Sequence, residues 1–470
     1  MRLKNTILVF ILLFTTFAAK AEGYRIAVQW EGLKDSSLFL AHYYDTKIYV
    51  NDTIQLDKQG KGTFSGKEKL KEGLYVLYLN EKIYFDILVG ADQEFAISTE
   101  NSDFISKLKI EKAKESEDFL AYQNFLRKKQ QDRNELEKQL KEGDSIAMES
   151  AKNKLQDLEK EMLKFMKDEK EKYPGTMYSL FIKTADQIII PEPQFDKNDP
   201  QYDSLAFFYY YNYRRDHFLD NIDFGDDRII NTPLLYPKLD TYFNKILIQA
   251  PDSIIPQAMK VINQSRKNKI MFQYTTSFLL NNSVQSKIMG MDEVFLKIAD
   301  EIYLKGEATW VDSTQRAKIA EEAYLTRYNL IGRTAPELVM ENIDGEMESL
   351  HQINAQYTVL VFWEPSCGHC KKEIPQLYKE VYEKYIGQNI EFFAVNIDDK
   401  KEEWQKFVEE HELSGWHHVW DTKHQSKFRF LYNVKATPLI YLLDKDKKIV
   451  AKKLDITNLV KLIDALLKKK

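Results

Sequence analysis

The chain has 470 residues, of which 44% are hydrophobic and only two are cysteines. This composition excludes a mostly disordered chain, a scaffold held by several disulfides and any metal site built from four cysteines. The 67 basic and 72 acidic residues give a formal charge of −5, which argues against a nucleic-acid-binding protein.

Residues 1–21 have the pattern of a secretory signal peptide. Arg2 and Lys4 precede an apolar run over 7–17, and 19–21 form a small-x-small cleavage site. The apolar run is about half as long as a membrane-spanning helix. We therefore expect the mature chain in the periplasm or on the exterior of the cell envelope. The alternative is an uncleaved N-terminal membrane anchor.

Residues 22–109 are predicted to form a β-sandwich-like domain. Segments rich in β-branched and aromatic residues are separated by turn clusters such as 57–60. Short strands at this spacing are typical of a small antiparallel sandwich. The predicted strands cover 24–28, 37–41, 73–79 and 82–88.

Residues 110–173 are predicted to form a helical hairpin interrupted at Gly143. The stretch is rich in Glu, Lys, Gln and Leu, and its second half carries apolar residues at alternating spacings of four and three, a heptad seam. The seam consists of Ala151, Leu155, Leu158, Met162 and Phe165. Either the hairpin is an intramolecular spacer, or it is a coiled coil that joins two copies of the chain.

Residues 174–330 are predicted to form an α-helical domain with unusually dense aromatic residues at 207–213. We interpret this aromatic stripe as core. The alternative is a groove that binds a partner polypeptide.

Residues 331–470 alternate between predicted strands and helices, which is the signature of an α/β layer fold. The fold class is therefore multidomain, with a β-sandwich, a helical middle region and a C-terminal α/β domain. The strands are expected at 357–363, 390–398, 439–444 and 447–453, and the helices at 367–386, 402–412 and 457–467.

The two cysteines stand three residues apart in the sequence WEPSCGHCKKEIP, residues 363–375. A buried strand precedes Cys367 and a helix follows it, so its thiol is expected at a helix N-terminus, where the helix dipole favours the thiolate nucleophile. Cys370 lies within disulfide reach and is the expected resolving thiol. Pro375 should kink the helix. No cofactor is expected apart from a redox-active Cys367–Cys370 disulfide.

Two other uses of the cysteine pair are weighed against redox chemistry. A structural disulfide across three residues closes almost no loop and adds little stability. A zinc site needs two more ligands, and the available histidines lack finger-like spacing. These candidates are His411, His417, His418 and His424. We expect no metal.

Residues 331–470 resemble the thioredoxin fold, in the membrane-anchored or periplasmic branch typified by TlpA and ResA. The similar features are Gly332-x-x-Ala335-Pro336, Trp363 before the cysteine pair, and Lys371-x-Glu373-x-Pro375 after it. The resemblance implies a cis peptide at Thr437–Pro438 against the cysteine pair, whereas an ordinary trans proline before a strand is the alternative. It also implies substrate contacts by Trp363, His369, Thr437 and Pro438. The upstream stretches 215–223 and 290–312 are similar to an uncharacterised helical module of secreted bacterial proteins.

Two positions depart from the thioredoxin pattern. Val361 stands where many thioredoxins carry a buried Asp, and the resemblance to ResA suggests that Glu373 takes this acid/base role. The alternative for Glu373 is a solvated helix residue. Gly368-His369 matches protein disulfide isomerase instead of the reductive branch, and a cationic His369 would make the pair more oxidising. The direction of electron flow stays open.

These features predict an extracytoplasmic thiol–disulfide oxidoreductase with Cys367, Cys370 and Glu373 as catalytic residues. Its expected partners are client proteins with thiols or disulfides, a membrane or periplasmic thiol that donates or accepts electrons, and a second copy if the hairpin dimerises. The alternatives are a non-enzymatic client-binding protein with a redox-sensitive domain, and a thiol peroxidase.

Overall fold

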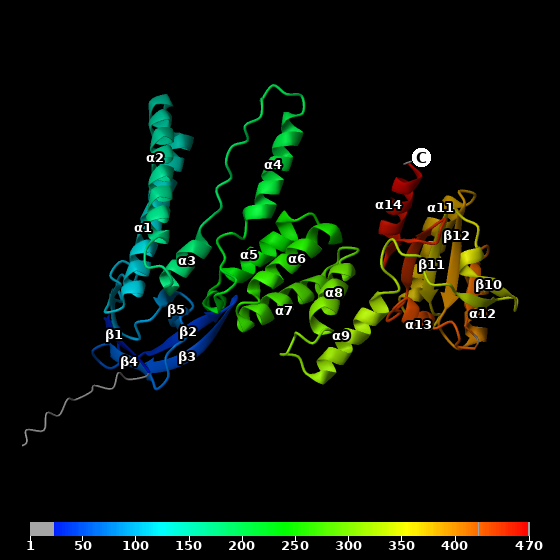
Figure 1. Cartoon of the computed structure of the whole chain (residues 1–470), viewed down its shortest axis with the longest axis horizontal. Coiled ribbons are helices and arrows are strands. Elements are labelled where there is room, and N and C mark those ends of the chain that lie inside the picture. The colour runs from blue at the N-terminus through cyan, green and yellow to red at the C-terminus, as the bar shows by residue number, and fades with distance from the viewer. Residues whose placement is uncertain (1–22, 422, 469–470) are drawn as a thin grey trace, which may run out of the picture. The chain divides into compact units, whose positions relative to one another are not determined.

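The computed structural model describes residues 23–421 and 423–468, and the signal peptide predicted over 1–21 lies outside them (Figure 1). No helix in the described part of the chain is long and apolar enough to cross a bilayer. The chain divides into two compact units between Ile246 and Leu247. This division falls inside the range 174–330, whose status as one domain stays a prediction.

The first unit begins with the predicted sandwich of two four-stranded sheets. One sheet has the order β4-β1-β7-β8 and the other β3-β2-β5-β6. One pair departs from the antiparallel prediction, because β1 and β7 run parallel. They are distant in sequence, so no hairpin turn forces them antiparallel. The strands are β1 (Tyr24–Glu31), β2 (Ser37–Tyr44), β3 (Lys47–Gln55), β4 (Lys61–Gly66), β5 (Gly73–Asn80), β6 (Ile83–Val89), β7 (Glu94–Glu100) and β8 (Lys109–Glu111).

The predicted helical hairpin follows the sandwich as α1 (Lys114–Glu142) and α2 (Ser145–Lys170), with Gly143 at the break. The seam of α2 packs against α1 of the same chain: Ala151 is fully buried, and the ring centroids of Phe165 and Phe125 lie 3.7 Å apart. The seam thus has an intramolecular partner. Its use in a dimer stays a prediction.

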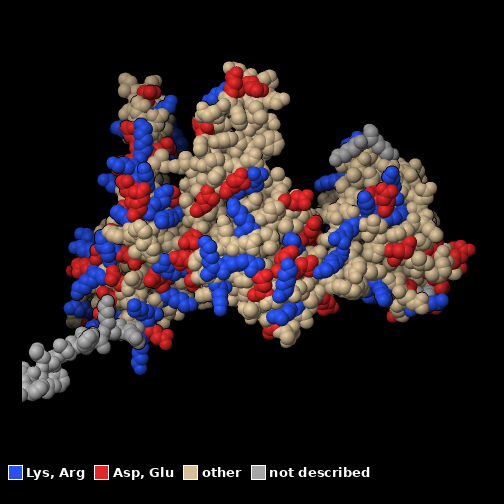
Figure 2. Space-filling view, viewed as in Figure 1, with Lys and Arg blue, Asp and Glu red and all other residues tan. Residues whose placement is uncertain are grey.

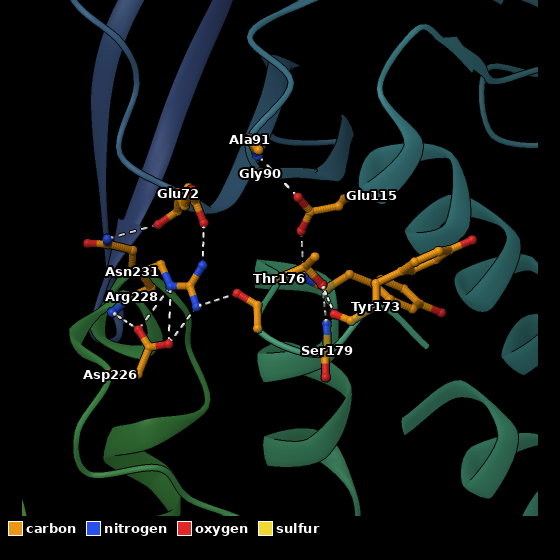
Figure 3. Close-up of polar contacts among 12 residues, drawn as sticks. Glu72, Gly90, Ala91, Glu115, Tyr173, Thr176, Ser179, Asp226, Arg228 and Asn231 are labelled. Carbon is orange, nitrogen blue, oxygen red and sulfur yellow. Dashed lines mark hydrogen bonds and ion pairs between the residues drawn. The ribbon is translucent and has the colours of Figure 1, made fainter. Parts of the chain in front are cut away.

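Polar contacts join the sandwich to the helices of the first unit (Figure 3). The carboxylate of Glu115 on α1 accepts the backbone N–H of Ala91 at 3.1 Å and that of Tyr178 at 2.9 Å. Nearby, Arg228 Nη1 donates to Glu72 Oε2 at 2.5 Å. Because these partners are distant in sequence, the contacts fix the hairpin and the following helices on the sandwich. The remaining helical segments of this unit are α3 (Met177–Ala185), α4 (Tyr202–His217), η1 (Asp227–Asn231), α5 (Leu235–Thr241) and η2 (Tyr242–Ile246).

The aromatic stripe of α4 is not core, and that prediction was wrong. Ala206 is the buried residue of this helix, whereas the side chains of Phe207 and Phe208 are 65% and 55% exposed. Consecutive aromatic residues point to all sides of a helix, so a single packing face cannot cover them. Figure 2 shows the surface over α4 as largely uncharged. A partner polypeptide for this surface stays a prediction.

The second unit begins with a small helical module and ends with the C-terminal α/β domain. The helices of the module are α6 (Pro251–Ser265), α7 (Lys269–Gln285), α8 (Asp292–Ile298), the π-helical turn η3 (Ala299–Tyr303) and α9 (Ser313–Thr326). A capping box at Asp312 and Gln315 begins α9, because the side chain of each residue accepts a hydrogen bond from the backbone N–H of the other.

The C-terminal domain has the predicted α/β architecture around a seven-stranded sheet of order β10-β9-β13-β12-β11-β14-β15. The central strand β11 pairs in parallel with β12 and antiparallel with β14. The strands are β9 (Val339–Asn342), β10 (Met347–Ser349), β11 (Tyr357–Trp363), β12 (Ile390–Asn396), β13 (His417–Trp420), β14 (Leu439–Asp444) and β15 (Ile449–Lys452). The helical segments are η4 (Leu350–Gln352), α10 (Cys370–Leu377), η5 (Tyr378–Tyr382), α11 (Glu383–Tyr385), α12 (Lys401–Glu410), α13 (Phe428–Leu431) and α14 (Ile456–Leu467).

Two hydrophobic cores cover the two faces of this sheet. Because side chains alternate along a strand, Val359, Val361 and Trp363 of β11 face one core, and Leu360 and Phe362 face the other. The first core also contains Cys370 and residues of α10 and α14. A strand buried from Thr358 to Trp363 therefore leads directly to the cysteine pair.

The helix predicted over 367–386 differs from the prediction in two ways. It begins as α10 at Cys370, after a turn that holds Cys367, and it changes to the π-helical turn η5 beyond Leu377. Pro375 lies in α10 and has no N–H to donate to the preceding turn, and the kink expected there stays a prediction.

Candidate active site

The cysteine pair lies where β11 ends and α10 begins. The backbone N–H of Lys371 donates to the carbonyl of Cys367 at 3.1 Å, so Cys367 occupies the position that precedes the first helical turn. Its side chain is half-buried, whereas Cys370 in the first turn of α10 is fully buried, and both are free thiols. One sulfur is thus accessible and the other lies beneath it.

The two thiols have opposite electrostatic environments. Burial raises the pKa of Cys367, but hydrogen bonds from the backbone N–H groups of Cys370 and His369 lower it, and the net shift is downward. Burial raises the pKa of Cys370 to about 12. At neutral pH, the accessible Cys367 is therefore the better source of thiolate.

The segment before β14 lies against the accessible thiol. The Thr437–Pro438 peptide is cis, as the family resemblance implied. Cys367 Sγ donates to the carbonyl oxygen of Thr437 at 3.5 Å. Residues 70 positions apart in the sequence thus meet at the reactive sulfur.

Glu364 is a site residue that the sequence reasoning missed. Its Oε1 accepts the hydroxyl of Thr437 at 3.0 Å, and its carbonyl oxygen accepts the N–H of Cys367 at 3.3 Å. This carboxylate ties the cysteine loop to the cis-proline segment. The sequence signal that could have identified Glu364 is its place as an acidic residue directly after an apolar strand.

The other predicted site residues lie at different depths. The Trp363 side chain is fully buried, with its ring centroid 5.1 Å from that of Phe407, so it supports the site from the core instead of facing a substrate. The His369 side chain is 83% exposed beside Cys367. Glu373 lies one turn into α10, where Oε1 is 3.9 Å from Nδ1 of His369.

The arrangement has the chemistry of a dithiol. Over residues 23–421 and 423–468, no group of three or more His, Cys, Asp or Glu side chains is placed to hold a metal ion. His418 is buried, and its Nε2 lies 2.6 Å from the carbonyl oxygen of Leu413. This imidazole is therefore engaged within the domain core.

Three family models match parts of the chain. The AhpC/TSA family model matches residues 331–452, which include the cysteine pair and the cis-proline segment. Two domains of unknown function match upstream: DUF4369 over 24–119 and DUF5106 over 209–329. The redox domain and both upstream regions thus have relatives in known families.

Curated relatives and solved structures are similar to parts of the chain. The thiol-disulfide oxidoreductase ResA of Bacillus cereus is 30% identical over 122 residues, covering 26% of this chain and 68% of that protein. ResA of Bacillus thuringiensis is 32% identical over 120 residues, covering 26% and 67%. A domain of a possible thiol-disulfide isomerase from Cytophaga hutchinsonii is 39% identical with a TM-score of 0.28, covering 30% of this chain and 97% of that one. A thioredoxin-like protein from Bacteroides caccae is 19% identical with a TM-score of 0.45, covering 60% and 98%.

Proposed function

The chain belongs to the ResA-like thiol–disulfide oxidoreductases, and we propose that it exchanges disulfides with client proteins outside the cytoplasm. The observation that carries this proposal is the division of roles between the two thiols. Cys367 is accessible with a lowered pKa, and Cys370 is buried with a raised one. An attacking thiol must be accessible and readily ionised, whereas a buried thiol with a raised pKa stays protonated until a base takes its proton in the resolving step.

In the reductive direction, the Cys367 thiolate attacks one sulfur of a client disulfide. A Cys367–client disulfide forms, and the second client sulfur leaves as a thiolate that takes up a proton. Cys370 then loses its proton and attacks Cys367 Sγ, which releases the first client sulfur as a thiol. The client gains two electrons and two protons, and the enzyme is left with a Cys367–Cys370 disulfide. Oxidation of a client dithiol is the same sequence in reverse.

The groups around the thiols supply orientation and proton transfer. The backbone of Thr437, next to the cis Pro438, pairs with the extended client chain, and the exposed His369 contacts the client beside the reactive sulfur. Glu373 relays the proton of the buried Cys370 during the resolving step. Its pairing with His369 places it on the solvent side of α10, where a proton can leave.

The redox partner is a membrane or periplasmic thiol that returns the pair to its starting state. The reduction potential of the full chain identifies the direction of electron flow. A value near about −270 mV indicates a reductase, and one between about −180 and −120 mV indicates an oxidase or isomerase. An imidazolium at His369 favours the second range, because it stabilises the reduced thiolate.

The location outside the cytoplasm rests on the sequence of residues 1–21. Cleavage after Ala21 leaves Glu22 as the first residue, which N-terminal sequencing of the exported protein would detect. The hairpin α1–α2 is the segment through which two copies would associate. Light scattering of the purified chain measures this directly.

The central experiment traps the mixed disulfide. Cys370→Ser cannot resolve the Cys367–client bond, so oxidised test proteins should accumulate as covalent adducts that dithiothreitol releases. The matched variant Cys367→Ser keeps the buried thiol and should form none. Absence of adducts with both oxidised and reduced test proteins would refute the mechanism. Rapid consumption of hydrogen peroxide by Cys367 in place of disulfide exchange would indicate a thiol peroxidase.

A further inference from the structure

An open groove of about 600 Å³ lies in the helical module of the second unit. Its walls are α7 and α9, and its floor comes from α8 and η3. The floor is apolar: Phe295 and Tyr303, with Leu280 of α7 beside them, are each at least nine-tenths buried. A groove of this volume holds a few amino-acid side chains.

One wall of the groove leads to the active site. Gln315, Lys318, Ile319 and Glu322 line it at spacings of three, one and three residues, so they form one stripe of α9 that ends at Glu322. The carboxylate of Glu322 pairs with Lys435, only two residues before Thr437. One lining residue of the groove, Glu322, therefore contacts the segment that leads to the cis-proline.

The module is held on the redox domain by contacts of several kinds. Glu322 Oε1 also accepts from Asn433 Nδ2 at 3.1 Å. The Tyr324 ring centroid lies 4.8 Å from that of Phe430, which belongs to α13. Lys452 of β15, almost fully buried, donates to the carbonyl oxygen of Asn329 at 2.7 Å. These contacts keep the groove in register with the segment that receives the client.

We propose that this groove is a client subsite, which binds an extended apolar segment of an unfolded or misfolded polypeptide next to its reactive disulfide. The inference rests on the proposed function. A chain that pairs with Thr437 can continue past Lys435 and Glu322 into the groove. Glu322 is neutralised by Lys435, so Lys318 is the remaining charge among the lining side chains, and the floor favours apolar side chains. Incompletely folded clients expose such segments.

The test compares two exposed positions on the same helix. Val284 lines the groove and its side chain is 60% exposed, whereas Ile270, 53% exposed on α7, is not among the lining residues. Val284→Asp and Ile270→Asp each add one carboxylate without disturbing a core. For the full chain, KM is measured with insulin as a protein disulfide and with glutathione disulfide as a small one.

We expect Val284→Asp to raise the ratio of the insulin KM to the glutathione disulfide KM at least fivefold, and Ile270→Asp to leave this ratio within twofold of wild type. An equal ratio in all three proteins would overturn the subsite. A changed molar mass of Val284→Asp in light scattering would also overturn it, because a second copy would then be the occupant.

A binding measurement separates the subsite from the catalytic proposal. Carboxymethylated insulin B chain, labelled for fluorescence anisotropy, cannot exchange disulfides but retains its apolar side chains. Its Kd should rise at least fivefold in Val284→Asp and not in Ile270→Asp. If wild type turns over neither disulfide, the proposed function fails. This Kd comparison then still decides whether the groove binds polypeptide.

Discussion

The difference in pKa between the two cysteines predicts which thiol an electrophile modifies. At pH 7, a thiol with a pKa of about 12 is ionised to about one part in 10⁵, and one with a pKa below 9.0 to more than about one part in 10². Cys367 therefore carries at least about 10³ times more thiolate than Cys370. The thiolate with the lower pKa is also the weaker nucleophile, at a Brønsted slope of about 0.4–0.5. For a difference of about three pKa units, this makes the Cys370 thiolate at most about 10¹·⁵ times more reactive than the Cys367 thiolate. The net preference for Cys367 is at least about 30-fold.

The assay is timed alkylation of the reduced full chain with iodoacetamide at pH 7. Peptide fragmentation after an acid quench assigns the label to Cys367 or Cys370. The same chain unfolded in urea is the control, because both thiols then have ordinary pKa values and should react at similar rates. Raising the pH should increase the Cys367 rate until the pH passes its pKa. Comparable rates at the two thiols in the folded chain, or faster reaction of Cys370, would refute the assignment of roles.

Three further predictions concern the second unit. Glu364→Ala removes the acceptor of the Thr437 hydroxyl, so the KM for a protein disulfide should rise about fivefold, which corresponds to about 1 kcal/mol. Glu364→Gln keeps an acceptor oxygen, so its KM should stay near that of the wild type. Lys452→Met leaves the Asp292 carboxylate without its cation and should lower the free energy of unfolding by about 3 kcal/mol in urea titrations, whereas the exposed Lys453→Met should not. Burial lowers the pKa of His418 to about 4, below its unfolded value near 6.5, so stability is complete above about pH 6.5 and falls by about 1.4 kcal/mol per unit as the pH drops towards 4. His418→Gln should remove that slope, and an unchanged slope would contradict the assignment.

The parts of the redox domain that were predictable are those with local signals. The strand at 357–363 matches β11 because it is a run of seven apolar or β-compatible residues, of which the last six are buried on both faces of the sheet. The helix that begins at Cys370 and the strand that follows Pro438 were also predictable, because Pro365 and Pro438 mark the turns before them. The short strands β9, β10 and β13 were not predicted, because three or four residues carry too little periodicity to be distinguished from loops.

Contacts between distant residues were beyond the sequence reasoning. Glu364 and Thr437 are 73 positions apart, and nothing near either residue indicates that they bond. The exposure of Phe207 and Phe208 was mispredicted for a related reason. Aromatic residues are usually buried, but whether another element covers α4 depends on tertiary packing.

Two carboxylates reach the cis-proline segment from different parts of the chain. Glu364 comes from the cysteine loop and bonds Thr437, whereas Glu322 comes from α9 and pairs with Lys435. The reduction potential depends on groups that touch the sulfurs, because it reflects the relative stability of dithiol and disulfide. If the groove beside α9 binds clients as proposed, client affinity depends in addition on that surface. Under that proposal, the direction of electron transfer and the choice of client are set by different residues, and changes in the helical module should alter client choice without altering the chemistry at Cys367.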